Sequence, residues 1–270
     1  MAATHDRAPR WSQLLELLAE RGRLSVAEVC GELGVSEATV RRDFNELAAQ
    51  QLATRTHGGV LATAVAYDLP ARYKSASQDG AKQQIAVAAA DLVEPGTVVG
   101  LNGGTTTSAV ARQLARRPEI AASGLRPAVT VVTNALNIAT EMVLRPAVRC
   151  IGLGGVARSE SYEQTGPIAI AAMSQLWLDL LVIGVDGLTA TTGATCRHDD
   201  EASINAAMVG RAERVVVVTT GDKVGRTTFA RICGSSAIDT LITDPTAPPA
   251  AIAALREAGV RVTTVGGGHR

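Results

Sequence analysis

The segment VGLNGGTTTS, residues 99–108, combines an apolar run, two adjacent glycines and a series of hydroxyl side chains. An apolar strand, a glycine turn and a helix start present backbone N–H groups that suit an anion such as phosphate. The segment therefore predicts a phosphate-binding loop formed by Asn102, Gly103, Gly104, Thr105 and Thr106. In the alternative interpretation, the two glycines form a tight strand-to-helix turn that binds nothing.

Polar residues follow other apolar runs in the same way. Short β-branched segments near residues 98, 130, 148, 180, 214, 239 and 260 alternate with helical patterns at 81–93, 105–116, 135–144, 167–176, 201–212 and 248–258. This alternation predicts an α/β domain whose open, mainly parallel sheet is covered on both faces. Ligands bind such sheets outside the carboxyl ends of the strands. The further candidates at that edge are Lys82, Thr133, Asn134, Gly154, Gly155, Asp186 and Lys223. Their amide, carboxylate and ammonium groups suit a small phosphorylated sugar or polyol.

The first fifty residues contain three helical patterns that together predict a helix-turn-helix. The first pattern runs from Arg10 to Gly22. The second begins at Ser25, which has the capping-box spacing to Glu28, and it ends at Gly34. The third begins at residue 36 and places apolar residues on one stripe and small or cationic residues on the opposite face. The expected buried residues are Val40, Phe44 and Leu47, and the expected outward residues are Ala38, Arg41, Arg42, Asn45 and Ala49.

The outward face of the third helix has the properties of a DNA-reading surface. The small side chain of Ala38 allows close approach to a major groove, and Arg41 and Arg42 can reach phosphate oxygens or guanine edges. The following residues, 52–62, predict a hairpin with Gly58 and Gly59 at its turn, which is typical of a wing. The predicted DNA-binding residues are Ser36, Thr39, Arg41, Arg42, Arg55 and His57.

Charge and composition limit the possible partners. Lys and Arg total 26 and Asp and Glu total 26, so DNA binding has to come from local placement of charge. Acidic residues also offset the arginines between residues 36 and 60, which leaves a helical hairpin used only for dimerisation as an alternative.

Four scattered cysteines, no signal peptide and apolar runs too short to span a bilayer predict a cytoplasmic protein with no membrane partner. The expected organisation is a winged helix-turn-helix at 8–62, a linker at 63–80 and a ligand-binding, oligomerising domain at 81–270.

Two other motifs point to weaker hypotheses. Residues 152–157, GLGGVA, match a dinucleotide-binding fingerprint, but that fingerprint requires a helix next and the following residues predict a loop. Residues 196–200, CRHDD, contain metal-ligand types, yet a second cluster that would complete a site is missing from the sequence, so a solvated loop is favoured. We therefore expect no metal, no cofactor and no catalytic residues.

These residues together resemble the DeoR family of bacterial transcriptional regulators over nearly the whole chain. The resemblance rests on residues 35–44 and 55–59 in the N-terminal part. In the rest of the chain it rests on Lys82, Gly103 to Thr106, Thr133, Asn134, Gly154, Gly155, Asp179, Gly184, Asp186, Gly187 and Lys223. It implies a winged helix-turn-helix joined to a sensor domain related to ribose-5-phosphate isomerase and glucosamine-6-phosphate deaminase. It also implies repression of a sugar or polyol operon that a phosphorylated intermediate relieves.

Three positions depart from the family pattern. The family usually has Glu where this chain has Ala81, Asp where it has Thr220, and often an acidic residue where it has Asn102. The loss of these carboxylates alters which ligand groups can be recognised.

Two hypotheses follow. In the first, a homodimer or homotetramer binds double-stranded operator DNA and responds to a phosphorylated sugar effector. In the second, the chain is a sugar-phosphate isomerase or deaminase with a helical assembly module. Such an enzyme needs a carboxylate base, and Asp186 is the only obvious candidate in the sequence motifs. The first hypothesis is favoured.

Overall fold

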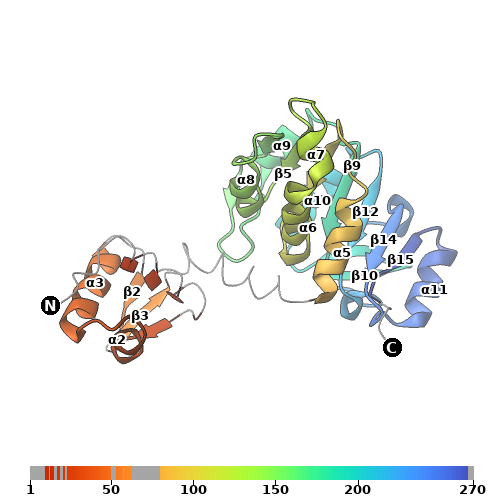
Figure 1. The fold of residues 1–270 in the computed structure, drawn as a ribbon. Coiled ribbons are helices and arrows are strands. Elements are labelled where there is room, and N and C mark those ends of the chain that lie inside the picture. Colours follow the sequence, from red (N-terminus) through yellow and green to blue (C-terminus); the bar gives the residue numbers. More distant parts are fainter. Residues whose placement is uncertain are drawn as a thin grey trace. The chain divides into compact units, whose positions relative to one another are not determined.

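The chain divides into two compact units, Met1–Ser75 and Ala76–Arg270, whose elements are drawn in Figure 1. The computed structural model describes residues 10, 11, 13, 14, 17, 18, 21, 23–49, 53–56, 58–62 and 80–266. The expected linker at 63–80 lies outside these residues except for its last position, and His57 lies outside them as well.

Helix caps define the helix-turn-helix of the first unit. Helix α2 (Val26–Leu33) begins at a capping box in which Ser25 Oγ accepts from the Glu28 N–H and Glu28 accepts from the Ser25 N–H. It ends at Gly34, whose φ of 64° lies in the left-handed region that glycine favours. Helix α3 (Glu37–Ala49) follows, and Ser36 Oγ accepts from the Thr39 N–H at its start. The predicted capping residues are therefore confirmed.

A small antiparallel sheet completes this unit. Strands β2 (Ala53–Arg55) and β3 (Gly59–Ala62) form the predicted hairpin, and β1 (Arg23–Ser25), which the sequence did not predict, pairs with the other edge of β3. A Cβ atom at Gly59 would overlap the backbone carbonyl of Leu24. The close pairing of β1 with β3 therefore requires glycine at position 59.

The core of the first unit contains the predicted stripe of α3, because Val40, Phe44 and Leu47 are buried. Asp43 is also buried, and its carboxylate accepts from Arg10 Nε at 2.7 Å and from Trp11 Nε1 at 3.1 Å. This acidic residue therefore ties the first helical segment to α3. It does not offset the arginines on the outward face of α3, so that face is more cationic than the sequence count indicates.

The second unit contains a seven-stranded parallel sheet in the order β15-β14-β12-β9-β4-β5-β6. Each of the seven apolar segments identified in the sequence forms one strand, which confirms the predicted open parallel sheet. The strands are β4 (Val98–Leu101), β5 (Val129–Thr133), β6 (Val148–Gly152), β9 (Leu180–Gly184), β12 (Val215–Val218), β14 (Thr240–Thr243) and β15 (Arg261–Thr264).

Helices cover both faces of this sheet (Figure 1). The β9 residues Leu180 and Val182 join one hydrophobic cluster, and Leu181 and Ile183 join the other, as expected when both faces are buried. The first cluster includes residues of α5 (Gly80–Ala90), α6 (Thr105–Arg116) and α8 (Leu136–Met142). The second includes residues of α9 (Pro167–Met173), α10 (Asp199–Val209) and α11 (Pro249–Glu257). None of the helices in the described residues is long and apolar enough to cross a membrane.

Several short elements were not predicted. They are α7 (Pro118–Ala122), the hairpin of β7 (Val156–Ala157) and β8 (Gln164–Thr165), and an antiparallel sheet of β10 (Gly187–Thr189), β11 (Gly193–Cys196) and β13 (Ala230–Cys233). Strands of two to four residues rich in glycine and threonine lack the alternation that identifies a strand from sequence. The β7–β8 hairpin confirms that no helix follows the GLGGVA motif directly.

We predict that replacing Asp43 by alanine destabilises the first unit by about 3 kcal/mol, because the substitution removes the carboxylate of a buried ion pair. The free energy of unfolding can be measured by urea denaturation. Glu37→Ala is the matched control, since the Glu37–Arg41 ion pair is exposed and its loss should change stability little. Equal effects of the two substitutions would contradict the structural role of Asp43.

Candidate functional site

The strand order reverses direction between β4 and β9. The chain continues from β4 to β5 on one side, whereas β9 and the later strands lie on the other, which makes this the point where open α/β sheets bind ligands. Asn102 follows β4 and joins the two strands, because its Nδ2 donates to the Gly184 carbonyl at 3.0 Å and its Oδ1 accepts from the Gly184 N–H at 2.8 Å. Asn102 was predicted to bind a ligand, and both polar groups of its side chain are hydrogen-bonded to Gly184, the last residue of β9 (Leu180–Gly184).

A cavity of about 360 Å³ lies at the carboxyl edge of the sheet, and we call it the carboxyl-edge cavity. It brings together three predicted residues, Lys82, Thr105 and Lys223. Thr105 is the first residue of α6, and its N-cap residue, Gly104, provides no side-chain cap. The N–H groups of the first turn and two ammonium groups therefore give this edge the character of an anion site. The remaining lining residues are Ala81, Thr220, Asp222, Asp244 and Thr246.

Lys223 is held in place by the loop that follows the neighbouring strand. Its Nζ donates to the Val185 carbonyl at 3.0 Å and to Asp186 Oδ1 at 3.2 Å. Asp186 was itself a predicted ligand-binding residue, and the structure places it beside the ammonium group. The Lys223 side chain is still 35% exposed, so the ammonium group can reach an additional anion.

The two carboxylates of this cavity were not predicted. Burial alone would raise the pKa of Asp244, but hydrogen bonds from Thr246 and the Gly221 N–H outweigh it and hold the pKa below its ordinary value. Asp222 accepts from Thr220 Oγ1 at 2.5 Å. Both carboxylates thus have partners within their own loops. Asp244 follows β14 directly. The other candidates were chosen because they follow apolar strands, and the same criterion would have identified Asp244.

Gly103 and Asn134 meet at Glu163, a residue that the sequence analysis missed. Asn134 Nδ2 donates to Glu163 Oε2 at 3.1 Å, and a Cβ atom at Gly103 would overlap the Glu163 side chain. Burial, together with the nearby Glu201 carboxylate, raises the pKa of Glu163 to about 8, although hydrogen bonds from Asn134 and Gly103 oppose the rise. Glu201 is paired with Arg158, whose Nε lies 3.2 Å from Glu201 Oε1.

The other candidates lie outside the lining of the carboxyl-edge cavity. Thr133 is buried and its Oγ1 accepts from the Ala135 N–H at 3.0 Å. Thr106 is also buried, within the first turn of α6, and Gly104 precedes that helix with a φ of 116°. Gly154 and Gly155 have φ values of 75° and 114° and lead into the β7–β8 hairpin.

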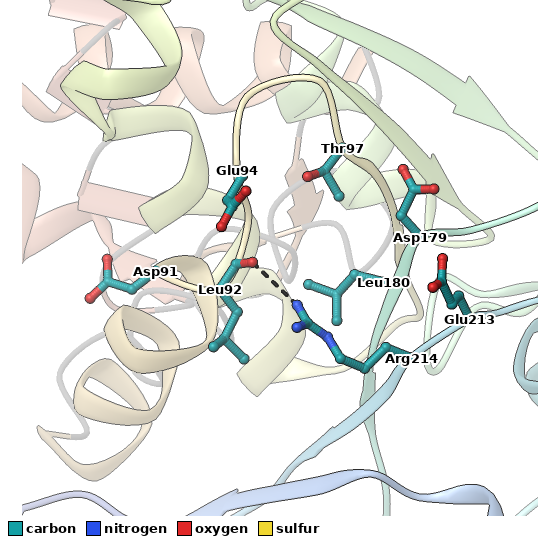
Figure 2. A pocket seen from close by; sticks show the side chains of 8 residues that line it. All are labelled: Asp91, Leu92, Glu94, Thr97, Asp179, Leu180, Glu213 and Arg214. Carbon is teal, nitrogen blue, oxygen red and sulfur yellow. Dashed lines mark hydrogen bonds between the residues drawn. The ribbon is translucent and has the colours of Figure 1, made fainter.

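A second cavity, of about 390 Å³, lies at the opposite, amino edge of the sheet, and we call it the amino-edge cavity (Figure 2). Arg214 extends across it and donates to the Leu92 carbonyl at 3.4 Å. The acidic residues that line it are Asp91, Glu94, Asp179 and Glu213. Four carboxylates beside one guanidinium disfavour a phosphorylated ligand, so the carboxyl-edge cavity is the better candidate for an anion.

Of the predicted DNA-binding residues that the structure describes, Ser36, Arg41 and Arg42 are exposed and Thr39 and Arg55 are half-buried. Arg41 is exposed and makes an ion pair with Glu37 at 3.4 Å, whereas Arg42 is exposed and has no ion-pair partner among the described residues. The hydroxyls of Ser36 and Thr39 lie 2.9 Å apart. Arg55 donates to the Gly59 carbonyl at 3.0 Å and lies over the Phe44 ring, so it braces the hairpin against α3.

Comparisons with known proteins match both units. The sorbitol operon regulator SorC from Klebsiella pneumoniae is 15% identical, with a TM-score of 0.44 over 93% of this chain and 100% of that chain. Ribose 5-phosphate isomerase A from Methanocaldococcus jannaschii is 18% identical, with a TM-score of 0.38 over 53% of this chain and 52% of that chain. Both values are too low to carry an argument about function.

The sequence relatives are closer and are transcriptional regulators. The glycerol-3-phosphate regulon repressor of Escherichia coli K12 is 31% identical over 89% of this chain and 91% of its own length. The HTH-type transcriptional repressor CsqR of the same strain is 30% identical over 94% of each chain. The HTH-type transcriptional repressor GlcR of Bacillus subtilis 168 is 29% identical over 86% of each chain.

Family profiles agree with these relatives and favour a regulator over the isomerase or deaminase alternative. Residues 10–64 match the DeoR-like helix-turn-helix domain, and residues 77–245 match the DeoR C-terminal sensor domain. The chain therefore belongs to the DeoR family of DNA-binding transcriptional regulators.

Proposed function

We propose that this regulator represses an operon for sugar or polyol use and that a phosphorylated sugar or polyol controls its affinity for operator DNA. The observation that carries the proposal is the carboxyl-edge cavity, in which Lys82, Lys223 and the uncapped start of α6 line one space of about 360 Å³. An anion and several hydroxyls match the groups around this space. The name of the glycerol-3-phosphate regulon repressor supports the same ligand class.

The effector acts by favouring a form of the protein that binds DNA less well. A coupling free energy of about 1 to 3 kcal/mol, or roughly 5- to 150-fold in affinity, is enough for such a switch. Because helix-turn-helix proteins read two half-sites, the regulator works as a homodimer or homotetramer on double-stranded operator DNA. This role places it in the cytoplasm and requires no metal or cofactor.

We predict that Arg42→Ala weakens operator binding by roughly tenfold to a hundredfold, because a contact from this arginine to a base or phosphate is worth about 1 to 3 kcal/mol. Affinity can be measured by fluorescence anisotropy with a DNA fragment from upstream of the gene. Arg261→Ala is the matched control, since Arg261 is also exposed but lies on β15 of the second unit. Unchanged affinity in the Arg42 variant would exclude α3 as the recognition helix.

We predict that Lys223→Met abolishes the response to phosphorylated ligands and leaves operator binding intact, because methionine keeps the length of the side chain but removes the ammonium group. Glycerol 3-phosphate, glucose 6-phosphate and fructose 6-phosphate are suitable probes in a thermal-shift assay. A probe at 100 times its dissociation constant adds about 2.7 kcal/mol to the stability of the wild type.

Arg214→Met is the control for this experiment, because Arg214 lines the amino-edge cavity. It should leave the ligand-induced shift unchanged. A shift that survives in the Lys223 variant and disappears in the Arg214 variant would move the effector site to the amino edge of the sheet.

A further inference from the structure

Glu163 occupies a position that connects three loops at the carboxyl edge. Its segment runs beside the loop after β5, where Ala135 and Glu163 form an antiparallel bridge and the Gln164 N–H donates to the Asn134 carbonyl. Its side chain reaches back to Gly103, in the loop after β4, whose N–H donates to the carboxyl group. The carboxyl group therefore lies against the loop that the sequence predicts to bind phosphate.

A buried acid at this position is costly for the fold. Glu163 is only 4% exposed, and the Glu201 carboxylate from α10 and the Asp186 carboxylate from the loop after β9 both oppose its ionisation. Arg158, which precedes Glu163 in the same hairpin, is paired with Asp200 at 2.7 Å and with Glu201 at 3.2 Å. Burying such a group as Glu163 lowers stability unless hydrogen bonds or an opposite charge compensate for the lost hydration.

The side chain of Asn134, which donates to Glu163, has an oxygen that accepts no hydrogen bond from the described residues. Asn134 is fully buried, and its Oδ1 has no hydrogen-bond partner in the part of the chain that the structure describes. Buried polar atoms are almost always hydrogen-bonded in folded proteins, so Asn134 Oδ1 is available to accept a hydrogen bond. A hydroxyl group, which both donates and accepts, is able to satisfy Asn134 Oδ1 and the Glu163 carboxyl group together.

We infer that Glu163, with Asn134, recognises the end of the effector remote from its phosphate and selects ligands whose remote end is an uncharged hydroxyl over those that end in a carboxylate. This inference rests on the proposed function and adds the chemistry of the second end of the ligand. A carboxylate end would bring a further negative charge beside Glu163, Glu201 and Asp186, which is unfavourable in a buried site. Glu163 thereby acts as a specificity-determining residue.

The protonation state of Glu163 supports this selection. With a pKa of about 8, the group is mainly a neutral acid at pH 7 and can donate a hydrogen bond to a hydroxyl. Ionisation at higher pH removes this donor and adds a charge that faces Glu201, Asp186 and the incoming anion. The affinity for a phosphorylated ligand should therefore fall as the pH rises from 7 to 9.

The experiment uses pairs of probes that differ only at the remote end. The pairs are glycerol 3-phosphate with 3-phosphoglycerate, erythritol 4-phosphate with erythronate 4-phosphate, and glucitol 6-phosphate with gluconate 6-phosphate. Calorimetric titration of the full-length wild type at pH 7 should show that the hydroxyl-ended member of the best-binding pair binds about tenfold more tightly or better. Glu163→Ala should reduce this preference to less than threefold.

Two further variants separate recognition from structural support. Glu163→Gln keeps a neutral donor and acceptor, so it should retain the preference for the hydroxyl end but lose the decline in affinity between pH 7 and 9. Glu160→Gln removes an exposed carboxylate from the same hairpin and should behave as the wild type in every titration.

Stability measurements without any ligand test the protonation state directly. An acid whose pKa is raised on folding loses its contribution to stability as the pH rises from its unfolded value of 4.5 to its folded value of about 8. The melting temperature of the Glu163→Gln variant should therefore rise above that of the wild type across this range and stay above it at higher pH. A constant difference would mean that Glu163 is ionised in the native protein and would overturn the inference.

The binding outcomes distinguish this inference from the proposed function. If the probes bind but Glu163→Ala keeps the wild-type preference, Glu163 serves only to support the loop and the inference is wrong. If none of the phosphorylated probes binds the wild type, the proposed function fails and the inference fails with it.

Discussion

The reversal of strand order between β4 and β9 is the constraint on which the candidate effector site depends. Because the chain continues to opposite sides from these two strands, the loops that follow them leave an edge that crossover helices do not close. The paired hydrogen bonds between Asn102 and Gly184 hold these loops together. Lys223 then reaches the same edge from β12 and is fixed by the loop after β9. The site is therefore a consequence of topology, and individual side chains adjust its chemistry.

The two edges of the sheet differ in their balance of charge. At the carboxyl edge, two lysines and the positive end of the α6 dipole lie near one another. Asp222 accepts a hydrogen bond from Thr220 in its own loop, and Asp244 accepts from Thr246 in its own loop and from the Gly221 N–H in the loop after β12. At the amino edge, four carboxylates surround Arg214 (Figure 2). A phosphate group is therefore favoured at the carboxyl edge over the amino edge. The two cavities have similar volumes, so their charged residues, and not their sizes, identify the better candidate for a phosphate site.

The sequence predicted the elements that repeat a pattern and missed those that depend on distant partners. The seven apolar strands were recognisable because each is buried on both faces, and Lys82, Thr105 and Lys223 were predicted to converge because they follow or face strand ends. Asp43 was counted among the acidic residues that offset the arginines of α3, since its partner Arg10 lies 33 residues away and spacing gives no indication of that pairing. Glu163 gave no signal because the β7–β8 hairpin is too short to show alternation.

The amide of Asn102 and the acid of Glu163 are both buried, and the chemistry of one affects the other. An amide at position 102 donates to the Gly184 carbonyl and accepts from its N–H, whereas a carboxylate is unable to donate and would leave that carbonyl without its partner. A carboxylate at this position would also place a second acid one residue from Gly103, against which Glu163 packs. Two neighbouring buried acids oppose each other's ionisation. The amide at position 102, where the family often has an acid, therefore avoids a second buried acid beside Glu163 of the β7–β8 hairpin.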